Sequence, residues 1–238
     1  MAGQETAPKR KRRERGSIDP EEIINGAFEL AEEVSIDNLS MPMLGKHLGV
    51  GVTSIYWYFR KKDDLLNAMT DRAITRYHLP AAMKATGDDW RSQLHHYAHA
   101  TRQAFLANPI LCDLLLIRST MSTKAGAMGA KEIERIVALL MAEGLSLEDA
   151  YDSYSAVQLH LRGSIVLERL YQRSKAEDSG TVAYYENLVI TPEDTPRLAE
   201  AESRGWVAGA PNDHNFEYVL GCILDNTARL IADRAAVS

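Results

Sequence analysis

The chain has 238 residues, of which 45% are hydrophobic and 25% charged, and its formal net charge is −6. This composition is ordinary for a soluble globular protein and does not by itself indicate a function. No apolar run approaches the ~20 residues that span a bilayer, and Cys112 and Cys222 are too few for a disulfide framework. Secretion and membrane insertion are therefore not indicated, and we expect a cytoplasmic protein.

The net charge is unevenly distributed along the chain. Residues 1–80 hold 12 basic and 12 acidic side chains, whereas the remaining 158 residues hold 15 and 21 and so carry the whole excess of −6. This shift indicates two modules with different partners. A local basic surface in the first module can bind a polyanion despite the acidic total.

The first seventeen residues contain almost no apolar side chains. Residues 9–15 hold six bases and one acid. Such a segment cannot bury a core, so residues 1–17 are predicted to form a disordered basic arm. The arm could follow a phosphate backbone or enter a minor groove, and the alternative is a solvated tail that only aids solubility.

The first helix is predicted from Asp19 to about Val34. Asp19 is a suitable N-cap, and Pro20 fits the first turn of a helix. The apolar residues that follow recur at helical spacing, at Ile24, Ala27, Phe28 and Ala31. This helix is expected to pack behind the next two as their scaffold.

A short helix, a glycine turn and a second short helix are predicted next. Ser40 can cap the first of these helices, and Gly49 can end it because glycine accepts positive φ. The second helix, about residues 53–59, places Ile55 and Phe59 on one inward face. Hydroxyl and aromatic side chains are left on its other sides.

These outward residues predict a contact surface for a polyanion. No Asp or Glu occurs from residue 38 to 62, and four lysine or arginine residues do. Glu or Lys would solvate an exposed helix better than this many aromatic side chains. The alternative for Trp57 and Tyr58 is that they pack on the following helix.

The pattern Leu39-Ser40, Leu44, Leu48-Gly49-Val50, residues 55–59 (IYWYF), Lys62 and Leu65-Leu66 resembles the helix-turn-helix of TetR-type transcriptional repressors. The resemblance implies base contacts by Val52, Thr53 and Trp57, and phosphate contacts by other positions. The whole DNA-binding set that we predict is Ser40, Val52, Thr53, Ser54, Tyr56, Trp57, Tyr58 and Lys62. The chain departs from the family pattern at Pro42 and Gly45, so guanine readout by this unit is in doubt.

The rest of the chain is predicted to be helical throughout. A linking helix runs from Lys62 to about residue 79, and Pro80 closes the smaller domain. Further helices are expected at 90–107, 131–142, 146–173 and 213–233, with a short apolar segment at 110–117 and a short helix near 192–204. The predicted fold is therefore all-α, with three parts: an arm (1–17), a helix-turn-helix DNA-binding domain with its linking helix (18–80), and a larger helical ligand-binding and dimerisation domain (81–238).

The C-terminal region also resembles TetR-type proteins, over residues 190–201 and 213–231. In that family the last two long helices pair with those of a second copy as a four-helix bundle. The resemblance therefore implies a homodimer that places two recognition helices in adjacent major grooves, ~34 Å apart.

A repressor of this type is expected to bind an unidentified small-molecule effector in its larger domain. Apolar residues with a few polar neighbours would line such a pocket. The ligand-binding candidates are Tyr97, Thr101, Phe105, Met121, Met128, Tyr154, Gln158 and Arg162. For any one of them, the alternative is an ordinary core or surface role.

Enzymatic features are weak. His95 and His99 lie one helical turn apart beside His96, but no carboxylate or cysteine lies at ligand spacing, so no metal site is predicted. Nucleotide-binding glycine loops and nucleophile elbows are absent from the sequence. We therefore predict a protein that is not an enzyme and has no cofactor.

The sequence as a whole predicts a ligand-responsive repressor. It would bind a palindromic double-stranded operator as a homodimer, associate with the nucleoid, have no membrane partner, and leave the DNA when the effector binds. The first alternative is a helical small-molecule carrier or sensor without specific DNA binding, and the second is a metal-dependent enzyme built on the histidine cluster. A carrier would not need the acid-free, aromatic surface at residues 38–62.

Overall fold

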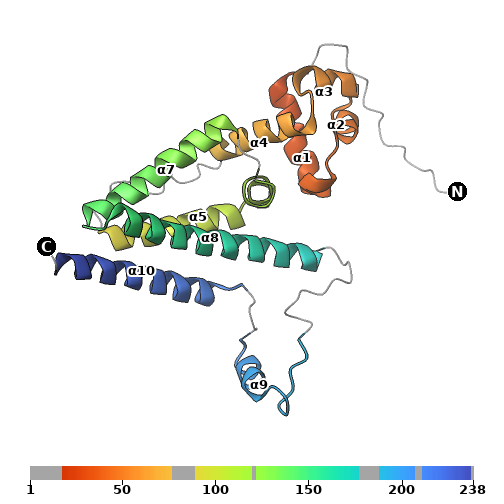
Figure 1. Cartoon of the computed structure of the whole chain (residues 1–238). Helices are drawn as coiled ribbons and strands as arrows, with labels where there is room; N and C mark the ends of the chain where they lie inside the picture. Colours follow the sequence, from red (N-terminus) through yellow and green to blue (C-terminus); the bar gives the residue numbers. More distant parts are fainter. Residues whose placement is uncertain (1–17, 77–88, 120–121, 177–187, 207–210, 237–238) are drawn as a thin grey trace. The chain divides into compact units, whose positions relative to one another are not determined.

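The computed structural model describes residues 18–76, 89–119, 122–176, 188–206 and 211–236. Within these ranges the chain forms helices and no strands (Figure 1). The all-α fold predicted from the sequence is confirmed. The helices are α1 (Pro20–Asn38), α2 (Met41–Leu48), α3 (Val52–Tyr58), α4 (Lys62–Arg76), α5 (Trp90–Leu106), α6 (Pro109–Cys112), the π-helix η1 (Asp113–Ile117), α7 (Thr123–Ala142), α8 (Leu147–Ala176), α9 (Pro196–Ser203) and α10 (Asp213–Ala235).

The chain divides into two compact units. The first comprises Met1–Tyr77 and Asp113–Ala127, and the second comprises His78–Cys112 and Met128–Ser238. Helices α1 to α4 therefore share a unit with η1 and the start of α7. The sequence-based division at residue 80 does not include this second segment in the smaller domain.

The core of the first unit forms where α1 packs on α2 and α4, and α2 packs on α3. Asp19 caps α1 as expected, since its Oδ1 accepts a hydrogen bond of 2.8 Å from the backbone N–H of Glu22. Gly26 of α1 lies so close to α2 that a Cβ atom there would collide with the side chain of Leu48. The fully buried side chains include Ile23, Ile36, Leu39, Leu44, Ile55, Leu65, Leu66 and Met69.

Helix α1 is interrupted at Ser35, whose φ of 69° lies in the left-handed region. A residue other than glycine rarely adopts this φ, so the backbone at Ser35 is strained. Leu39 donates its backbone N–H to the Ser35 carbonyl over 3.1 Å, which holds the last residues as a separate turn. The regular part of the helix thus ends where the sequence predicted, at about Val34.

In the second unit, α8 lies beside α5 and α10 (Figure 1) and also packs against α6. Ser146 begins α8 as predicted, because its Oγ accepts a hydrogen bond of 3.1 Å from the backbone N–H of Asp149. The buried residues of the three long helices form one apolar core, which includes Leu94, Ala98, Phe105, Val157, Leu161, Ile165, Phe216, Leu220 and Leu224.

Two elements differ from the sequence-based prediction. Helix α7 begins at Thr123, not Lys131, because the Oγ of Ser122 accepts the Ala125 backbone N–H over 3.0 Å and caps a turn rich in small residues. The apolar segment 110–117 consists of α6 and the π-helix η1. A hydrophobic run carries no periodicity that would separate these two forms.

Candidate nucleic-acid interface

The turn between α2 and α3 has the geometry of a helix-turn-helix. Ser40 caps α2 by accepting the Met43 backbone N–H over 3.4 Å, and Gly49 ends it with a left-handed φ of 69°. The Val50 N–H donates to the Gly45 carbonyl over 2.9 Å and folds the chain back. A Cβ atom at Gly45 would lie only 3.2 Å from the Val50 oxygen, which is tighter than an ordinary contact. Gly45, one of the two positions that depart from the family pattern, therefore suits the tight turn.

Helix α3 buries one face and exposes the rest. Ile55 and Phe59 are buried as predicted, whereas Thr53, Tyr56 and Trp57 are exposed. The remaining predicted contacts, Ser40, Val52, Ser54, Tyr58 and Lys62, are half-buried.

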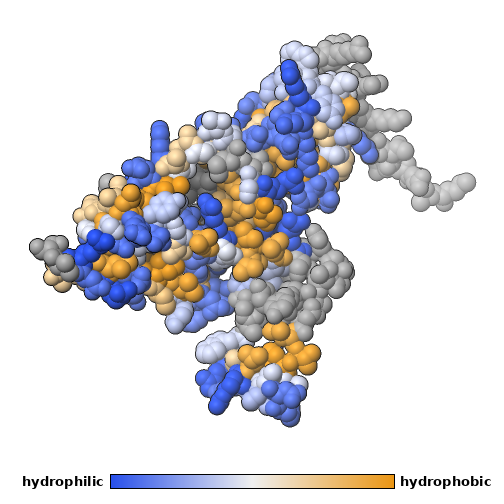
Figure 2. All heavy atoms as spheres, viewed as in Figure 1, coloured by the Kyte–Doolittle hydropathy of each residue, from blue (hydrophilic) through white to orange (hydrophobic). Residues whose placement is uncertain are grey.

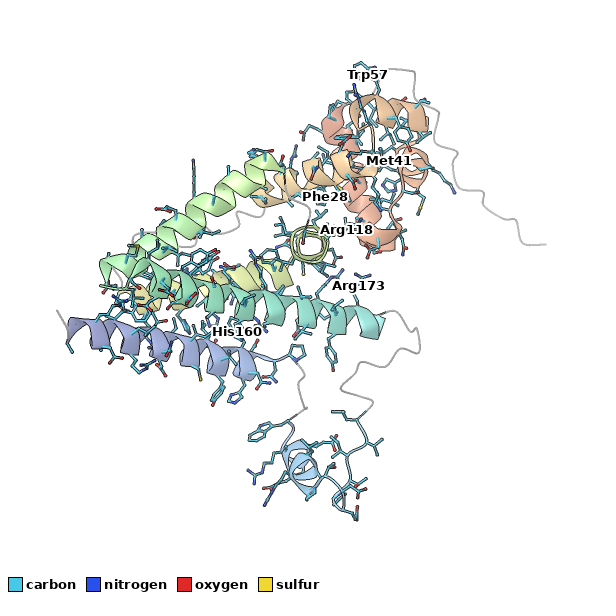
Figure 3. The ribbon with its side chains drawn as sticks, in the orientation of Figure 1. Phe28, Met41, Trp57, Arg118, His160 and Arg173 are labelled. Atoms are coloured by element: carbon cyan, nitrogen blue, oxygen red, sulfur yellow. The ribbon has the colours of Figure 1, made fainter. Side chains whose placement is uncertain are left out.

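Trp57 is 79% exposed and projects from α3 (Figure 3). Its ring and that of Tyr58 are nearly perpendicular, at 84°, with 4.9 Å between centroids. Exposure of this degree excludes a core position for Trp57 within the first unit. The basic side chains Lys46, Arg60 and Lys61 are exposed as well.

The hydroxyl of Tyr58 has a partner within the protein. It donates a hydrogen bond of 3.1 Å to the backbone carbonyl of Ile18, just before α1. A tyrosine hydroxyl has one proton, so Tyr58 cannot donate to a phosphate while this bond is made. The sequence-based prediction did not include this structural role.

The ammonium group of Lys62 lies at the C-terminal end of α1. Its Nζ donates to the carbonyls of Ile36, over 2.9 Å, and Asp37, over 3.1 Å. Burial and the nearby Arg118 lower the pKa of Lys62, against the opposing charges of Asp37 and Asp63. Two of its three N–H donors are thus used to cap a helix, and one is left for a phosphate.

Residues of the segment 113–127 contact the same helices. Arg118 forms an ion pair of 2.5 Å with Asp37, and Ser122 hydrogen-bonds to Asp71 of α4. The sequence pattern does not indicate these residues, because their partners lie 81 and 51 positions away. No local pattern could have indicated them.

Comparison with known proteins decides the family. Residues 23–69 match the family model described as "Bacterial regulatory proteins, tetR family", and residues 83–229 match the "Tetracyclin repressor-like, C-terminal domain". An HTH-type transcriptional repressor of Mycobacterium tuberculosis is 58% identical over 228 residues, which are 96% of this chain and 87% of the relative. The chain belongs to the TetR family. It is therefore a DNA-binding transcription regulator and not an enzyme.

Solved structures share the TetR fold seen here. A possible TetR family transcriptional regulator from Streptomyces coelicolor has a TM-score of 0.70 at 24% identity, covering 89% of this chain and 100% of the other. A variant TetR from Acinetobacter baumannii, solved in complex with minocycline, has a TM-score of 0.59 at 22% identity, covering 90% and 98%. Among the described residues of this TetR-family protein, no helix is long and apolar enough to cross a membrane.

Some of the predicted effector-binding residues lie together in the second unit. The Gln158 amide donates to the hydroxyl of Tyr97, which is buried between α5 and α8. Burial raises the pKa of Tyr97 to about 12 and also raises the pKa of Tyr154. Arg162 is close enough to act electrostatically on both tyrosines. Tyr97 and Tyr154 are buried, whereas Gln158 is half-buried and Arg162 is exposed, so this group extends from the core to the surface of the unit.

The other predicted effector-binding residues differ in how exposed their side chains are. Phe105 is buried, Thr101 is half-buried, Met128 is exposed, and Met121 lies outside the described residues. The basic arm, residues 1–17, also lies outside them.

Helices α8 and α10 leave a set of large apolar side chains uncovered in the single chain. Hydrophobic side chains are visible on the surface of this unit in Figure 2. Leu159 is 74% exposed, although neighbouring residues of α8 are fully buried. The other exposed members of the set are Leu147, Tyr151, Leu167, Leu170, Tyr218 and Val219.

Proposed function

We propose that this TetR-family protein is a repressor that binds a palindromic operator as a homodimer and releases it when a small molecule binds the larger domain. The observation that carries the DNA-binding part is the exposed face of α3, with Trp57 at its centre. The relative from M. tuberculosis is named a transcriptional repressor, and this name supports repression as the outcome.

The exposed face of α3 has suitable chemistry for a major groove. Thr53 and Trp57 offer apolar atoms to thymine methyl groups, and Val52 borders them. Tyr56, Ser54 and the remaining donor of Lys62 suit phosphate oxygens. Lys46, Arg60 and Lys61 add positive charge without an acidic neighbour between residues 38 and 62. Ser40 and Tyr58 support this surface through their bonds to the backbone.

The uncovered side chains of α8 and α10 support a homodimer. Large aliphatic residues at exposed helix positions are costly in water and favour burial against another apolar surface. A second copy of the chain presents the same set, so a twofold axis would bury both. Such an axis also produces the repeated half-sites of a palindrome.

The polar group around Tyr97 supports a small-molecule effector. A buried hydroxyl and an amide among apolar residues are typical of pockets that orient a ligand. One structural neighbour was solved with minocycline, which supports the same kind of role for the larger domain here. A ligand can shift the protein toward a non-binding state only if it binds that state more tightly. A repressor of this kind works in the cytoplasm, at the nucleoid.

A mobility shift on the intergenic DNA beside the protein's own gene tests the proposal. Trp57→Ala should weaken specific binding by about 10-fold or more, since one good base contact contributes about 1–3 kcal/mol of discrimination. The matched control is Trp206→Ala, which removes an equally large exposed ring from the second unit. Equal binding by the parent to operator and random DNA would favour the carrier alternative instead.

Sedimentation measures the dimer separately. Leu159→Glu should shift the protein toward monomer, because a charge would be buried in the proposed interface. Leu198→Glu, an exposed leucine of α9, provides the control. If the parent is a monomer at micromolar concentration, or if Leu159→Glu leaves the dimer intact, this interface is wrong.

A further inference from the structure

Side chains from α5 and α10 bring three potential metal ligands to one point in the second unit. The ligand atoms of His95, His99 and Glu217 all lie within 4.8 Å of one another. His95 Nε2 is 3.2 Å from Glu217 Oε2, and His99 Nε2 contacts the other carboxylate oxygen. The sequence favoured no metal site because no carboxylate lies at ligand spacing along α5. The fold supplies that carboxylate from α10.

The buried ring nitrogen of His99 has an unusual environment. Among the described residues, His99 Nε2 has no hydrogen-bond partner, although it contacts the Glu217 carboxylate. The contact is close but lacks the geometry of a hydrogen bond. A cation between this nitrogen and the carboxylate oxygens would replace the close contact with metal–ligand bonds.

The distances fit a metal ion with small side-chain adjustments. Zn–N and Zn–O bonds are about 2.0–2.2 Å, so two ligand atoms of a tetrahedral ion lie about 3.4 Å apart. The separation between His95 and Glu217 is already close to this value. The imidazole rings of His95 and His99 lie side by side, with 4.4 Å between centroids.

A cavity of about 430 Å³ reaches two of the three ligands, and the third, His99, is not among its lining residues. His95 and Glu217 line it, and Gly221 contributes no side chain to block it. The cavity provides an entry path and room for a water molecule as a further ligand. It contains none of the predicted effector-binding residues.

The cationic side chains nearby are already paired with carboxylates. Arg91, which also lines the cavity, forms an ion pair of 2.5 Å with Asp225. Arg102 forms one of 2.6 Å with Asp213 and stacks over Phe216. These pairs reduce the repulsion that a bound cation would otherwise meet.

We propose that His95, His99 and Glu217 bind one divalent transition-metal ion of the zinc class. Two imidazole nitrogens and one carboxylate oxygen form the ligand set that zinc accepts with one open position. The ion would link α5 to α10. Its site is separate from the group around Tyr97 and from the DNA-facing surface.

Calorimetric titration of the full chain, without a histidine tag, with Zn²⁺ alone provides the test. We expect one ion per chain, and Co²⁺ should give a visible spectrum without thiolate bands. His99→Ala should weaken Zn²⁺ binding by at least about 10-fold, because even residues that only hydrogen-bond to a metal ligand contribute that much to affinity. Glu217→Gln should also weaken Zn²⁺ binding. The matched control is His96→Ala, which removes an adjacent exposed imidazole outside the cluster and should bind like the parent.

Two further measurements keep the result interpretable. Zn²⁺ should raise the thermal midpoint of the parent and of His96→Ala but not of Glu217→Gln, whose exposed position leaves the fold intact. Cys222→Ser should retain binding, since Cys222 is exposed on the same helix. The absence of Zn²⁺ binding by the parent, or unchanged binding after His99→Ala and Glu217→Gln, would overturn the proposal. Neither outcome depends on operator binding.

Discussion

The two units expose apolar side chains of different kinds. In the first unit the exposed large apolar side chains of α3 are aromatic, and hydroxyl groups and lysines surround them. In the second unit the exposed large apolar residues of α8 are mostly leucines, on a helix whose other side is fully buried. Aromatic rings with polar neighbours suit a wet, charged groove, whereas aliphatic side chains suit a dry protein interface. The difference separates a surface for DNA from a surface for a second copy.

The largest expected effect tests whether the two units are independent. Leu44→Ala in α2 and Leu220→Ala in α10 each remove a fully buried leucine, and each should cost about 2–5 kcal/mol. Leu44→Ala should abolish operator binding and leave the dimer intact in sedimentation, because only the first unit loses its core. Leu220→Ala should weaken the dimer first. If each variant lost both operator binding and the dimer, the two units would not fold independently.

The helix-turn-helix was predictable because its determinants are local. Ser40, Gly49, Ile55 and Phe59 act on helices only a few residues away, so spacing alone indicates a cap, a turn and a buried face. The family resemblance then indicated which outward positions face DNA. The predicted contacts still await a binding measurement.

The interactions that the sequence could not indicate join distant segments. Tyr58 and Lys62 hydrogen-bond to carbonyls 40 and 26 positions away, and backbone carbonyls carry no sequence signal. Glu217 meets His95 across 122 positions. The start of α7 was missed for a different reason, because Gly126 and Gly129 lower helix propensity in its first turns.

An intermediate effect tests the role of Lys62. Lys62→Ala removes two hydrogen bonds from a charged donor to the end of α1, and should destabilise the first unit by about 1.5–3 kcal/mol. Lys61→Ala, its exposed neighbour, should change stability by less than about 0.5 kcal/mol, since its bond to Asp64 uses the backbone N–H. Urea unfolding monitored by tryptophan fluorescence measures both.

The salt dependence of operator binding then separates the two possible functions of Lys62. If the third donor of Lys62 contacts a phosphate, Lys62→Ala should reduce the magnitude of the slope of log K against log salt by about 0.9. If the role of Lys62 is purely structural, the slope should be the same in the parent and the variant. The comparison is made at a temperature where both variants are folded. A variant as stable as the parent would contradict the capping role.

The smallest expected effect comes from two tyrosines of α3, Tyr56 and Tyr58, that lie two residues apart. Tyr58→Phe removes the bond to the Ile18 carbonyl and should cost about 0.5–1.5 kcal/mol of stability, with no change in the salt slope. Tyr56→Phe removes an exposed hydroxyl and should leave stability unchanged but weaken binding to every DNA sequence. The pair is matched in chemistry, so any difference reflects position. If Tyr58→Phe weakened DNA binding more than Tyr56→Phe at equal stability, Tyr58 would exchange its partner on binding, and the Ile18 bond would belong only to the free protein.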